Sequence, residues 1–215
     1  MTQLASEKHV SQYFRIHPTD PQPRLVKQAA AILAAGGIIA YPTDSTYALG
    51  CSVGDKEAVE RIRRLRHLDE GHDMTLVCRD LSELSLYAFV DNQSFRLLKR
   101  YLPGPYTFLL RGTKDVPRRL LHPKRKTIGL RVPDHAITLA LLAAHGAPIL
   151  STTLRLPGDS EPLVDPEEIR GRLEHRVELV IDGGPCGLDP TTVIDLTDPL
   201  PQLVRAGKGH WREAG

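Results

Sequence analysis

The spacing of hydrophobic residues alternates along the chain between a helical and a strand-like pattern. In residues 24–35, RLVKQAAAILAA, one helical face collects the apolar side chains Leu25, Val26, Ala29, Ile32 and Leu33. Gly36 and Gly37 follow, and glycine readily adopts the left-handed conformation that ends many helices. The pattern therefore predicts a helix over residues 24–35, followed by a short buried strand over residues 38–41.

Four further helices are predicted where a capping residue or a proline precedes a helical hydrophobic pattern. Aspartate accepts hydrogen bonds from the free N–H groups of a first turn, and proline is favoured at the first helical position. Asp80 with Glu83 also forms a D-x-x-E pattern like a capping box. The predicted helices begin after Asp55, after Asp80, after Asp134 (running through Leu142 and stopped by Gly146) and at Pro166 (running to Glu174).

Short runs rich in Val, Ile, Leu and Thr predict the strands of one sheet. These runs cover residues 74–78, 107–112, 127–132, 148–153, 177–182, 191–196 and 202–207. Mixed with helices and without a long linker, they predict a single α/β domain with a twisted, mixed sheet and flanking helices. We assign this domain to residues 19–207 and expect residues 1–18 and 208–215 to be loosely attached termini.

Composition supports a globular protein and excludes several other classes. The chain has 215 residues, of which 41% are hydrophobic and 25% charged, and its apolar runs are far shorter than the roughly 18 residues of a membrane span. The start of the chain lacks the basic and apolar regions of a secretory signal, so we expect a cytoplasmic protein without membrane association. Cys51, Cys78 and Cys186 are widely spaced, which argues against a disulfide framework or a structural zinc site.

Charge and histidine patterns add two candidate features. Net charge is only +2, but residues 61–67 (RIRRLRH) and 114–131 gather basic side chains that suit phosphate binding; the alternative is a solvated basic face. His67 and His72 lie near Asp69, Glu70 and Asp73, but their spacing matches no common ligand motif, and we expect no metal held by protein ligands alone.

Hydroxyl-rich segments stand at the ends of predicted strands, where α/β proteins often form ligand clefts. In YPTDSTYALGC (41–51), the hydroxyls of Thr43, Ser45 and Thr46 suit a ligand pocket, and Asp44 can accept an ammonium group or hold a hydroxyl. A capped surface turn would give the same local pattern.

Three later segments carry the same kind of signal. In STTLRLPG (151–158), Ser151, Thr152 and Thr153 can donate to phosphate, and Arg155 can pair with it. PGPYT (103–107) indicates either a close backbone approach to a ligand or a plain turn. In residues 181–196 a glycine-rich loop leads into Thr191. The chain contains neither G-x-x-x-x-G-K-[ST] nor G-x-G-x-x-G, which disfavours the common nucleotide folds, and no nucleophile signature appears.

The order of these segments resembles the YrdC-like family, which includes the threonylcarbamoyl-adenylate synthases. Across residues 20–207 the blocks are YPTDSTYALG, RIRRLR, PGPYT, KTIGLRVPDH, LSTTL, DGGPCG and TTVIDL. Each block alone is weak, and the seven in this order are specific. RIRRLR followed by GHDMTLVCRDLSELS, and the stretch VPRRLL…KRKTIGLRVP, look most like the YciO branch. The resemblance implies a YrdC-like domain with a basic concave cleft.

The resemblance also implies an activity and a set of ligands. Family synthases combine L-threonine, bicarbonate and ATP, release pyrophosphate and form threonylcarbamoyl-AMP, which serves tRNA modification; Mg²⁺ would accompany ATP. By resemblance, Thr43, Asp44 and Ser45 would bind the amino acid. The residues implied for the nucleotide are Arg66, Arg131, Ser151, Thr153, Arg155, Thr191 and Arg205. Arg131 interrupts a strand that otherwise looks buried, so we expect it to face phosphate; the alternative is a structural pair with a carboxylate.

Two positions depart from the synthase pattern. The synthases carry K-x-R where this chain has Arg66-His67-Leu68, and S-x-N where it has Thr153-Leu154-Arg155. One cation is therefore missing, and arginine replaces an asparagine that both donates and accepts hydrogen bonds. These departures, together with the basic clusters, keep two alternatives to a nucleotidyltransferase open: a protein that binds double-stranded RNA or tRNA without efficient synthase activity, and a nucleotide-binding regulator.

Overall fold

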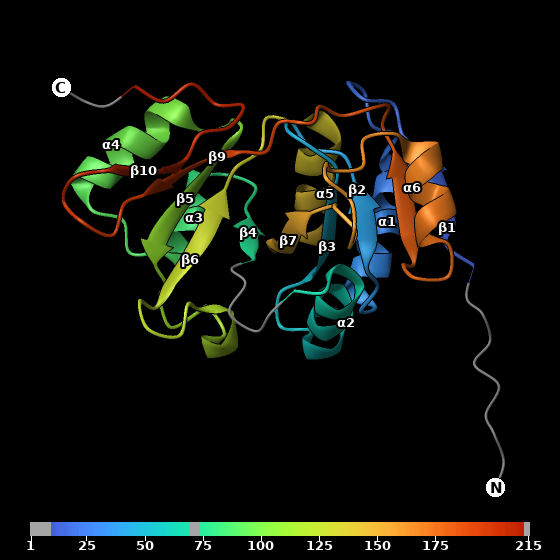
Figure 1. The fold of residues 1–215 in the computed structure, drawn as a ribbon, viewed down its shortest axis with the longest axis horizontal. Helices are drawn as coiled ribbons and strands as arrows, with labels where there is room; N and C mark the ends of the chain where they lie inside the picture. The colour runs from blue at the N-terminus through green and yellow to red at the C-terminus, as the bar shows by residue number, and fades with distance from the viewer. Residues whose placement is uncertain (1–9, 69–73, 213–215) are drawn as a thin grey trace, which may run out of the picture.

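The computed structural model describes residues 10–68 and 74–212 and arranges them around one sheet (Figure 1). Its strands are β1 (Gln12–Arg15), β2 (Ile39–Tyr41), β3 (Ala48–Ser52), β4 (Thr75–Val77), β5 (Tyr106–Arg111), β6 (Thr127–Arg131), β7 (Ile149–Thr153), β8 (Leu179–Asp182), β9 (Thr192–Asp195) and β10 (Gln202–Arg205). They lie in the order β1-β8-β2-β3-β7-β4-β6-β5-β9-β10. The sheet contains parallel pairs such as β1–β8 and β5–β9 as well as antiparallel pairs such as β3–β7. This confirms the predicted mixed sheet.

The helices are α1 (Pro23–Ala34), α2 (Lys56–Arg66), α3 (Leu81–Tyr87), α4 (Asn92–Tyr101), α5 (Ala136–His145) and α6 (Pro166–Leu173). The capping predictions hold for α2 and α3, since Asp55 accepts from the Ala58 N–H at 2.9 Å and Asp80 from the Glu83 N–H at 2.8 Å. Helix α5 begins one residue later than predicted, because His135 rather than Asp134 is its N-cap, and it ends at Gly146 with φ of 73°.

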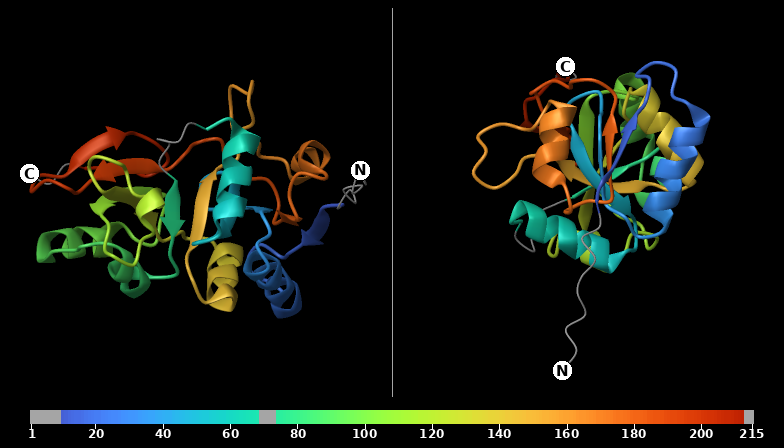
Figure 2. Two further views of the ribbon diagram at one scale, coloured as in Figure 1. Left: turned by 90° about the horizontal axis from the view of Figure 1, so that it is seen from below. Right: turned by 90° about the vertical axis from the view of Figure 1, so that its right-hand side faces the viewer.

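Two apolar clusters cover the two faces of the sheet, and period-two alternation along the strands decides which residue joins which. On one face, called here the α2 face, Leu49, Leu76, Leu130 and Phe108 pack with apolar residues of α2, α3, α4 and α6. On the other, the α5 face, Tyr41, Val77, Ile149 and Leu179 pack with residues of α1 and α5. Figure 2 shows α1 and α5 side by side at one end of the molecule, whereas α3 and α4 lie at the other end.

Both chain ends are more firmly attached than predicted within the described residues. Strand β1 falls in the segment expected to be loose, yet it pairs in parallel with β8 along its whole length. At the other end, the Lys208 N–H donates to the Pro190 carbonyl at 2.8 Å, and Trp211 packs against Tyr101 with 5.1 Å between ring centroids. Tertiary pairing fixes these segments, and their own sequence gives no sign of it. Every helix in residues 10–68 and 74–212 is too short or too polar to cross a membrane.

Candidate functional site

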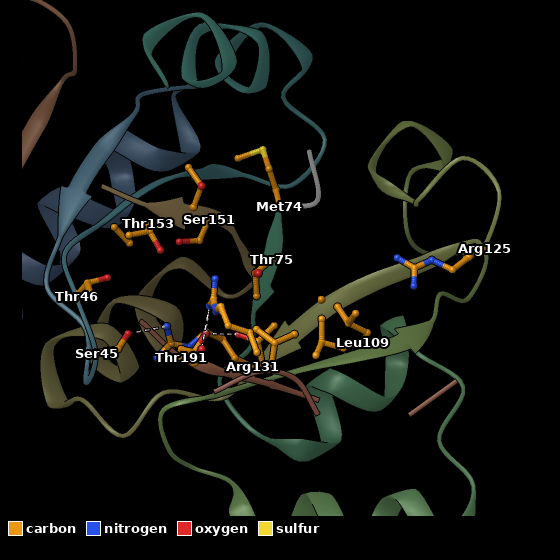
Figure 3. Close-up of a pocket in the computed structure, with 17 residues that line it drawn as sticks. Ser45, Thr46, Met74, Thr75, Leu109, Arg125, Arg131, Ser151, Thr153 and Thr191 are labelled. Atoms are coloured by element: carbon orange, nitrogen blue, oxygen red, sulfur yellow. Dashed lines mark hydrogen bonds between the residues drawn. The ribbon is translucent and has the colours of Figure 1, made fainter. Parts of the chain in front are cut away.

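A cavity of about 320 Å³ opens on the α5 face, over the strands that α1 and α5 leave uncovered (Figure 3). Alternation along the strands builds its floor. In β5, Phe108 and Leu110 enter the core of the α2 face, so Thr107 and Leu109 point to the cavity. In β6, Leu130 is likewise buried in the core. Its neighbours Gly129 and Arg131 line the cavity.

The cavity has a polar end and an apolar end. At the polar end the lining residues are Ser45, Thr46, Arg131, Ser151, Thr152, Thr153, Thr191 and Arg205. The larger apolar residues of the lining are Met74, Leu109, Val193 and Val204. Figure 3 shows Leu109 on the side toward Arg125, and Met74 nearer to Ser151 and Thr75. Small-molecule sites commonly combine apolar walls with a few polar groups that fix orientation. A ligand with a flat apolar part and a charged part matches this arrangement.

Ser151 is prepared as a hydrogen-bond donor toward the cavity. The buried Tyr41 hydroxyl donates to Ser151 Oγ at 2.8 Å, and burial raises the pKa of Tyr41 to about 12, so Tyr41 keeps its proton. A hydroxyl that accepts one hydrogen bond still has its own proton to donate. Since Ser151 lines the cavity, that proton is available to a ligand.

Arg131 lies in the cavity wall and is also paired with a carboxylate. Its guanidinium forms an ion pair with Asp44, and it donates to Ser45 Oγ at 3.4 Å. The second carboxylate oxygen of Asp44 accepts from the Asp134 N–H at 3.0 Å. Both side chains of the ion pair are more than 90% buried. The alternative foreseen for this residue, a structural pair with a carboxylate, is therefore present, and Asp44 acts on Arg131 within the fold.

The Thr43 hydroxyl does not face the cavity. It donates to the Thr46 carbonyl at 2.7 Å and accepts from the Ser45 N–H at 3.1 Å, which closes the turn between β2 and β3. Thr43 is absent from the cavity lining, and its side chain holds Ser45 and Thr46 in place. The segment 41–51 is thus a capped turn, which was one interpretation of its sequence. It also brings the hydroxyl-bearing residues Ser45 and Thr46 to the cavity, as the other interpretation, a polar turn at a pocket, expected.

A second cavity of about 410 Å³ adjoins the first, and the two share Thr152, Thr153 and Arg205. Arg66 and Arg155 line the second cavity and not the first. The Arg66 guanidinium is already engaged, since it donates to Thr152 Oγ1 at 2.8 Å and to the backbone carbonyls of Thr153 and Arg155. Burial, and then the charge of Arg155, lower the pKa of Arg66 to about 10, which leaves it protonated at neutral pH. Arg66 therefore braces the end of β7.

The two remaining cavity arginines also have protein partners. Arg205 donates to the Thr191 carbonyl at 2.8 Å, and the Thr191 hydroxyl contacts that of Thr107 at 2.9 Å. Arg125 forms an ion pair of 3.5 Å with Asp195. Because Arg131 and Arg125 are both paired with carboxylates, the strongly basic cleft expected from the family resemblance stays a prediction.

Several lining residues were not predicted from the sequence. Thr75, Thr107, Leu109, Arg125, Gly129 and Val193 come from strand interiors or their edges, and although several of them fall within the quoted motifs, none was assigned to the site. The alternation of residues 106–111 was the available signal, but using it requires knowing which face of the sheet a helix covers. Of PGPYT, only Thr107 reaches the cavity, and the rest is a turn in which the Gly104 N–H donates to the Val132 carbonyl at 2.9 Å. Residues 69–73, which include His72, lie outside the described residues.

Comparison with known proteins shows which family has this architecture. A family model for Sua5, YciO and YrdC proteins, described as telomere recombination, matches residues 31–207. The uncharacterized protein YciO of Escherichia coli strain K12 is 61% identical over 93% of this chain and 97% of its own length. The crystal structure of E. coli YciO superposes with a TM-score of 0.90.

Synthases are similar at lower identity. The threonylcarbamoyl-AMP synthase of Alkalilimnicola ehrlichii is 33% identical over 83% of this chain and 95% of its own length. The crystal structure of P. abyssi Sua5 complexed with L-threonine has a TM-score of 0.84 at 26% identity; it matches 92% of this chain, which spans 58% of that one. From the extent of the family match and the identity to YciO, the chain belongs to the Sua5/YciO/YrdC family.

Proposed function

We propose that this protein is a nucleotidyltransferase that binds ATP and an amino acid and forms a carbamoyl-adenylate, with L-threonine as the amino acid. The observation that carries the proposal is the division of one cavity into an apolar end and an end lined with hydroxyls and arginines. An adenosine group suits the first, and phosphates with a small polar amino acid suit the second. Support comes from the synthases at about 30% identity and from the related Sua5 complexed with L-threonine.

The proposed reaction makes modest demands on side-chain acids and bases. The threonine amine condenses with bicarbonate to give a carbamate and water. A carbamate oxygen then attacks the α-phosphorus of ATP, the bond from that phosphorus to the bridging oxygen breaks, and pyrophosphate leaves with the electron pair. Positioning and charge neutralisation supply most of the rate in such transfers. The hydroxyl of Ser151 and the charge of Arg205 are placed to hold phosphate oxygens.

Magnesium enters this proposal as part of the substrate, MgATP. Mg²⁺ prefers oxygen ligands and keeps several waters when it is bound with phosphates. Among the residues that the structure describes, the lining of the cavity offers hydroxyl oxygens and contains neither aspartate nor glutamate. Such a lining fits an ion carried by the phosphates themselves, with the Ser151 and Thr153 hydroxyls near it.

The departures from the synthase pattern bear on the second cavity. Arg66 braces the end of β7 through three acceptors, so the cations left for phosphate there are Arg155 and Arg205. The synthases have a neutral amide at the position of Arg155 and a cation at the position of Leu68. The positive charge of Arg155 therefore compensates for the cation that this chain lacks at position 68. In this proposal Arg155 binds the leaving pyrophosphate.

The test is pyrophosphate release from MgATP with L-threonine and bicarbonate, using the parent protein, Ser151→Ala and the matched control Ser85→Ala on the exposed side of α3. The parent should need all three substrates. Ser151→Ala should lower kcat/KM about tenfold, equivalent to about 1.4 kcal/mol for one hydrogen bond to a charged group, and Ser85→Ala should match the parent. Release that is independent of threonine, or absent at enzyme concentrations near those of ATP, refutes the proposal.

A specific observation also supports RNA binding as a second candidate function. The loop between β5 and β6 exposes Arg118, Arg119, Lys124, Arg125 and Lys126, and Arg125 lies at the cavity rim. Such a row can follow the phosphates of a double-stranded region or a tRNA. Binding to tRNA should then weaken steeply with salt, and the variant Lys124→Ala/Lys126→Ala should reduce the salt dependence. Weak binding that does not respond to salt excludes this function.

A further inference from the structure

The segment after β10 packs beside β9 next to the cavity, and the side chain of Lys208 extends from it to the turn after β2. The backbone of the segment is fixed by hydrogen bonds from the Gly207 N–H to Thr192 Oγ1 at 3.0 Å and from the Lys208 N–H to the Pro190 carbonyl at 2.8 Å. Beyond it, the Tyr106 hydroxyl donates to the His210 carbonyl at 3.0 Å. These contacts hold Lys208 in a defined place, although its side chain is exposed.

Two glycines allow the segment to lie this close. A Cβ at Gly207 would stand 2.3 Å from the Pro190 carbonyl oxygen, and one at Gly209 would stand 2.4 Å from the Tyr106 ring. The first obstacle is backbone and cannot move aside. The segment is therefore packed directly on the residue that precedes Thr191, a residue of the cavity lining.

The side chain of Lys208 reaches the turn after β2. Its Nζ donates to the Asp44 carbonyl at 2.6 Å, and the next residue, Ser45, lines the cavity. The backbone of Lys208 thus lies beside Thr191 and its ammonium group beside Ser45. Figure 3 shows Ser45, Thr191 and Arg131 gathered at the same end of the cavity.

Charge distinguishes Lys208 from Arg131 at this end. Arg131 is paired with Asp44, and both are buried, so their charges offset each other. Among the described residues Lys208 has no carboxylate within ion-pair distance, and its side chain donates to a neutral backbone carbonyl. An ammonium group has three donors, so Lys208 retains donors for a ligand. Arg205 of the cavity lining also has no carboxylate partner among these residues, but the proposed function assigns it to phosphate, so Lys208, beside Ser45, is the cation left for a second anionic group.

We propose that Lys208 binds the α-carboxylate of the substrate amino acid and so restricts the substrates of this site to amino acids with a free carboxylate. This inference rests on the proposed function, because it concerns the amino-acid substrate of that reaction. A carboxylate facing an unpaired ammonium gains a charge-assisted hydrogen bond, whereas an amine without a carboxylate gains nothing from it. The amino group, which must react with bicarbonate, is left free toward the rest of the cavity.

The test is calorimetric titration with two probes, L-threonine and 1-amino-2-propanol, which is threonine without its carboxylate. The proteins are the parent, Lys208→Met, Lys208→Arg and the control Lys99→Met, whose lysine is exposed in the last turn of α4. Lys208→Met should weaken L-threonine binding about tenfold, change 1-amino-2-propanol binding less than about twofold, and leave the melting temperature unchanged. Lys208→Arg should keep most of the affinity, and Lys99→Met should behave as the parent.

Two results overturn the inference while leaving the proposed function intact. In one, Lys208→Met binds L-threonine as the parent does. In the other, it weakens both probes equally, which would mean that Lys208 only holds the turn at Asp44. If the parent protein binds no L-threonine and releases no threonine-dependent pyrophosphate, the proposed function fails and this inference fails with it.

Discussion

The α5 face of the sheet consists of two regions that follow the same strand geometry and serve different ends. Over β8 and β2, its side chains Leu179, Ile39 and Tyr41 are buried under α1 and α5. Over β6, β5 and β9, the equivalent positions are Gly129, Thr107 and Val193, which line the cavity. Both regions alternate with period two, so the strands themselves do not cause the difference.

The connections between the strands cause it. Helices α1 and α5 return on the α5 face and bury the first region, whereas α3 and α4, which come between β4 and β5, pack on the α2 face. The second region therefore has a core on one side and a cavity on the other. One sheet can thus separate the residues that stabilise the fold from those available to a ligand.

The ion pair Asp44–Arg131 joins the two regions, since Asp44 belongs to the turn after β2 and Arg131 to β6. Asp44→Ala should have the largest effect on stability, a loss of about 3–5 kcal/mol, because it leaves a buried guanidinium without its partner. Urea denaturation measures the loss.

The double variant Asp44→Ala/Arg131→Met is the control for this prediction. It removes both charges and should recover at least half of the stability lost in the single variant. A loss below about 1 kcal/mol in Asp44→Ala would mean that the pair behaves as an exposed one.

A matched pair of leucine truncations separates the two regions directly. Leu33 of α1 is fully buried against the α5 face, and Leu109 of β5 is partly exposed in the cavity. Leu33→Ala should cost about 2–5 kcal/mol of unfolding free energy and leave ATP affinity unchanged, whereas Leu109→Ala should cost about 1 kcal/mol and weaken ATP binding. Denaturation and nucleotide titration of both variants check this, and equal losses of stability would contradict the division.

The elements were predictable to the extent that their signals are local. Helix α1 follows from apolar spacing, and α2 and α3 from aspartates that do accept first-turn N–H groups. Strand β3 was missed because residues 48–52 follow a turn-like segment, and β1 because a four-residue strand depends on its pairing with β8. Helix α4 was also missed, although Asp91 caps it by accepting from the Ser94 N–H at 2.7 Å.

Some residues of the site could likewise be predicted from the local sequence, whereas others depend on contacts between distant segments. Ser45, Ser151, Thr153 and Thr191 could be proposed because hydroxyls gather at strand ends. The pair of Asp44 with Arg131 and the contact of Lys208 with Asp44 join residues 87 and 164 positions apart, and they depend on which segments the fold brings together. Thr43 shows the reverse situation, because its hydroxyl stands in a motif of the family resemblance and is hydrogen-bonded within its own turn; its role toward the amino acid stays a prediction.

Gly129 gives the prediction with the smallest effect on stability and the clearest effect on binding. It lies in the middle of β6 on the cavity floor, where a Cβ would stand 3.1 Å from Thr107 Cγ2 and 3.2 Å from Thr75 Oγ1. Both neighbours are side-chain atoms, which can shift by a few tenths of an ångström, and β-branched residues suit strands. Gly129→Val should therefore lower the free energy of unfolding by about 1 kcal/mol or less, since crowding and improved strand propensity oppose each other.

The same substitution should strongly impair the cavity, because the valine methyl groups rise from its floor beside Leu109. We expect the Kd for ATP to increase about tenfold or more, because the added methyl groups would occupy volume that the bound nucleotide needs in a cavity of this size. Gly171→Val on α6, where an added Cβ meets nothing within 4 Å, is the control for valine replacing glycine away from the cavity. It should keep or slightly gain stability, because valine has a better helix propensity than glycine, and it should keep the ATP affinity of the parent. If Gly129→Val binds ATP as tightly as the parent does, the nucleotide does not lie on this part of the floor, and the apolar end of the cavity serves another ligand.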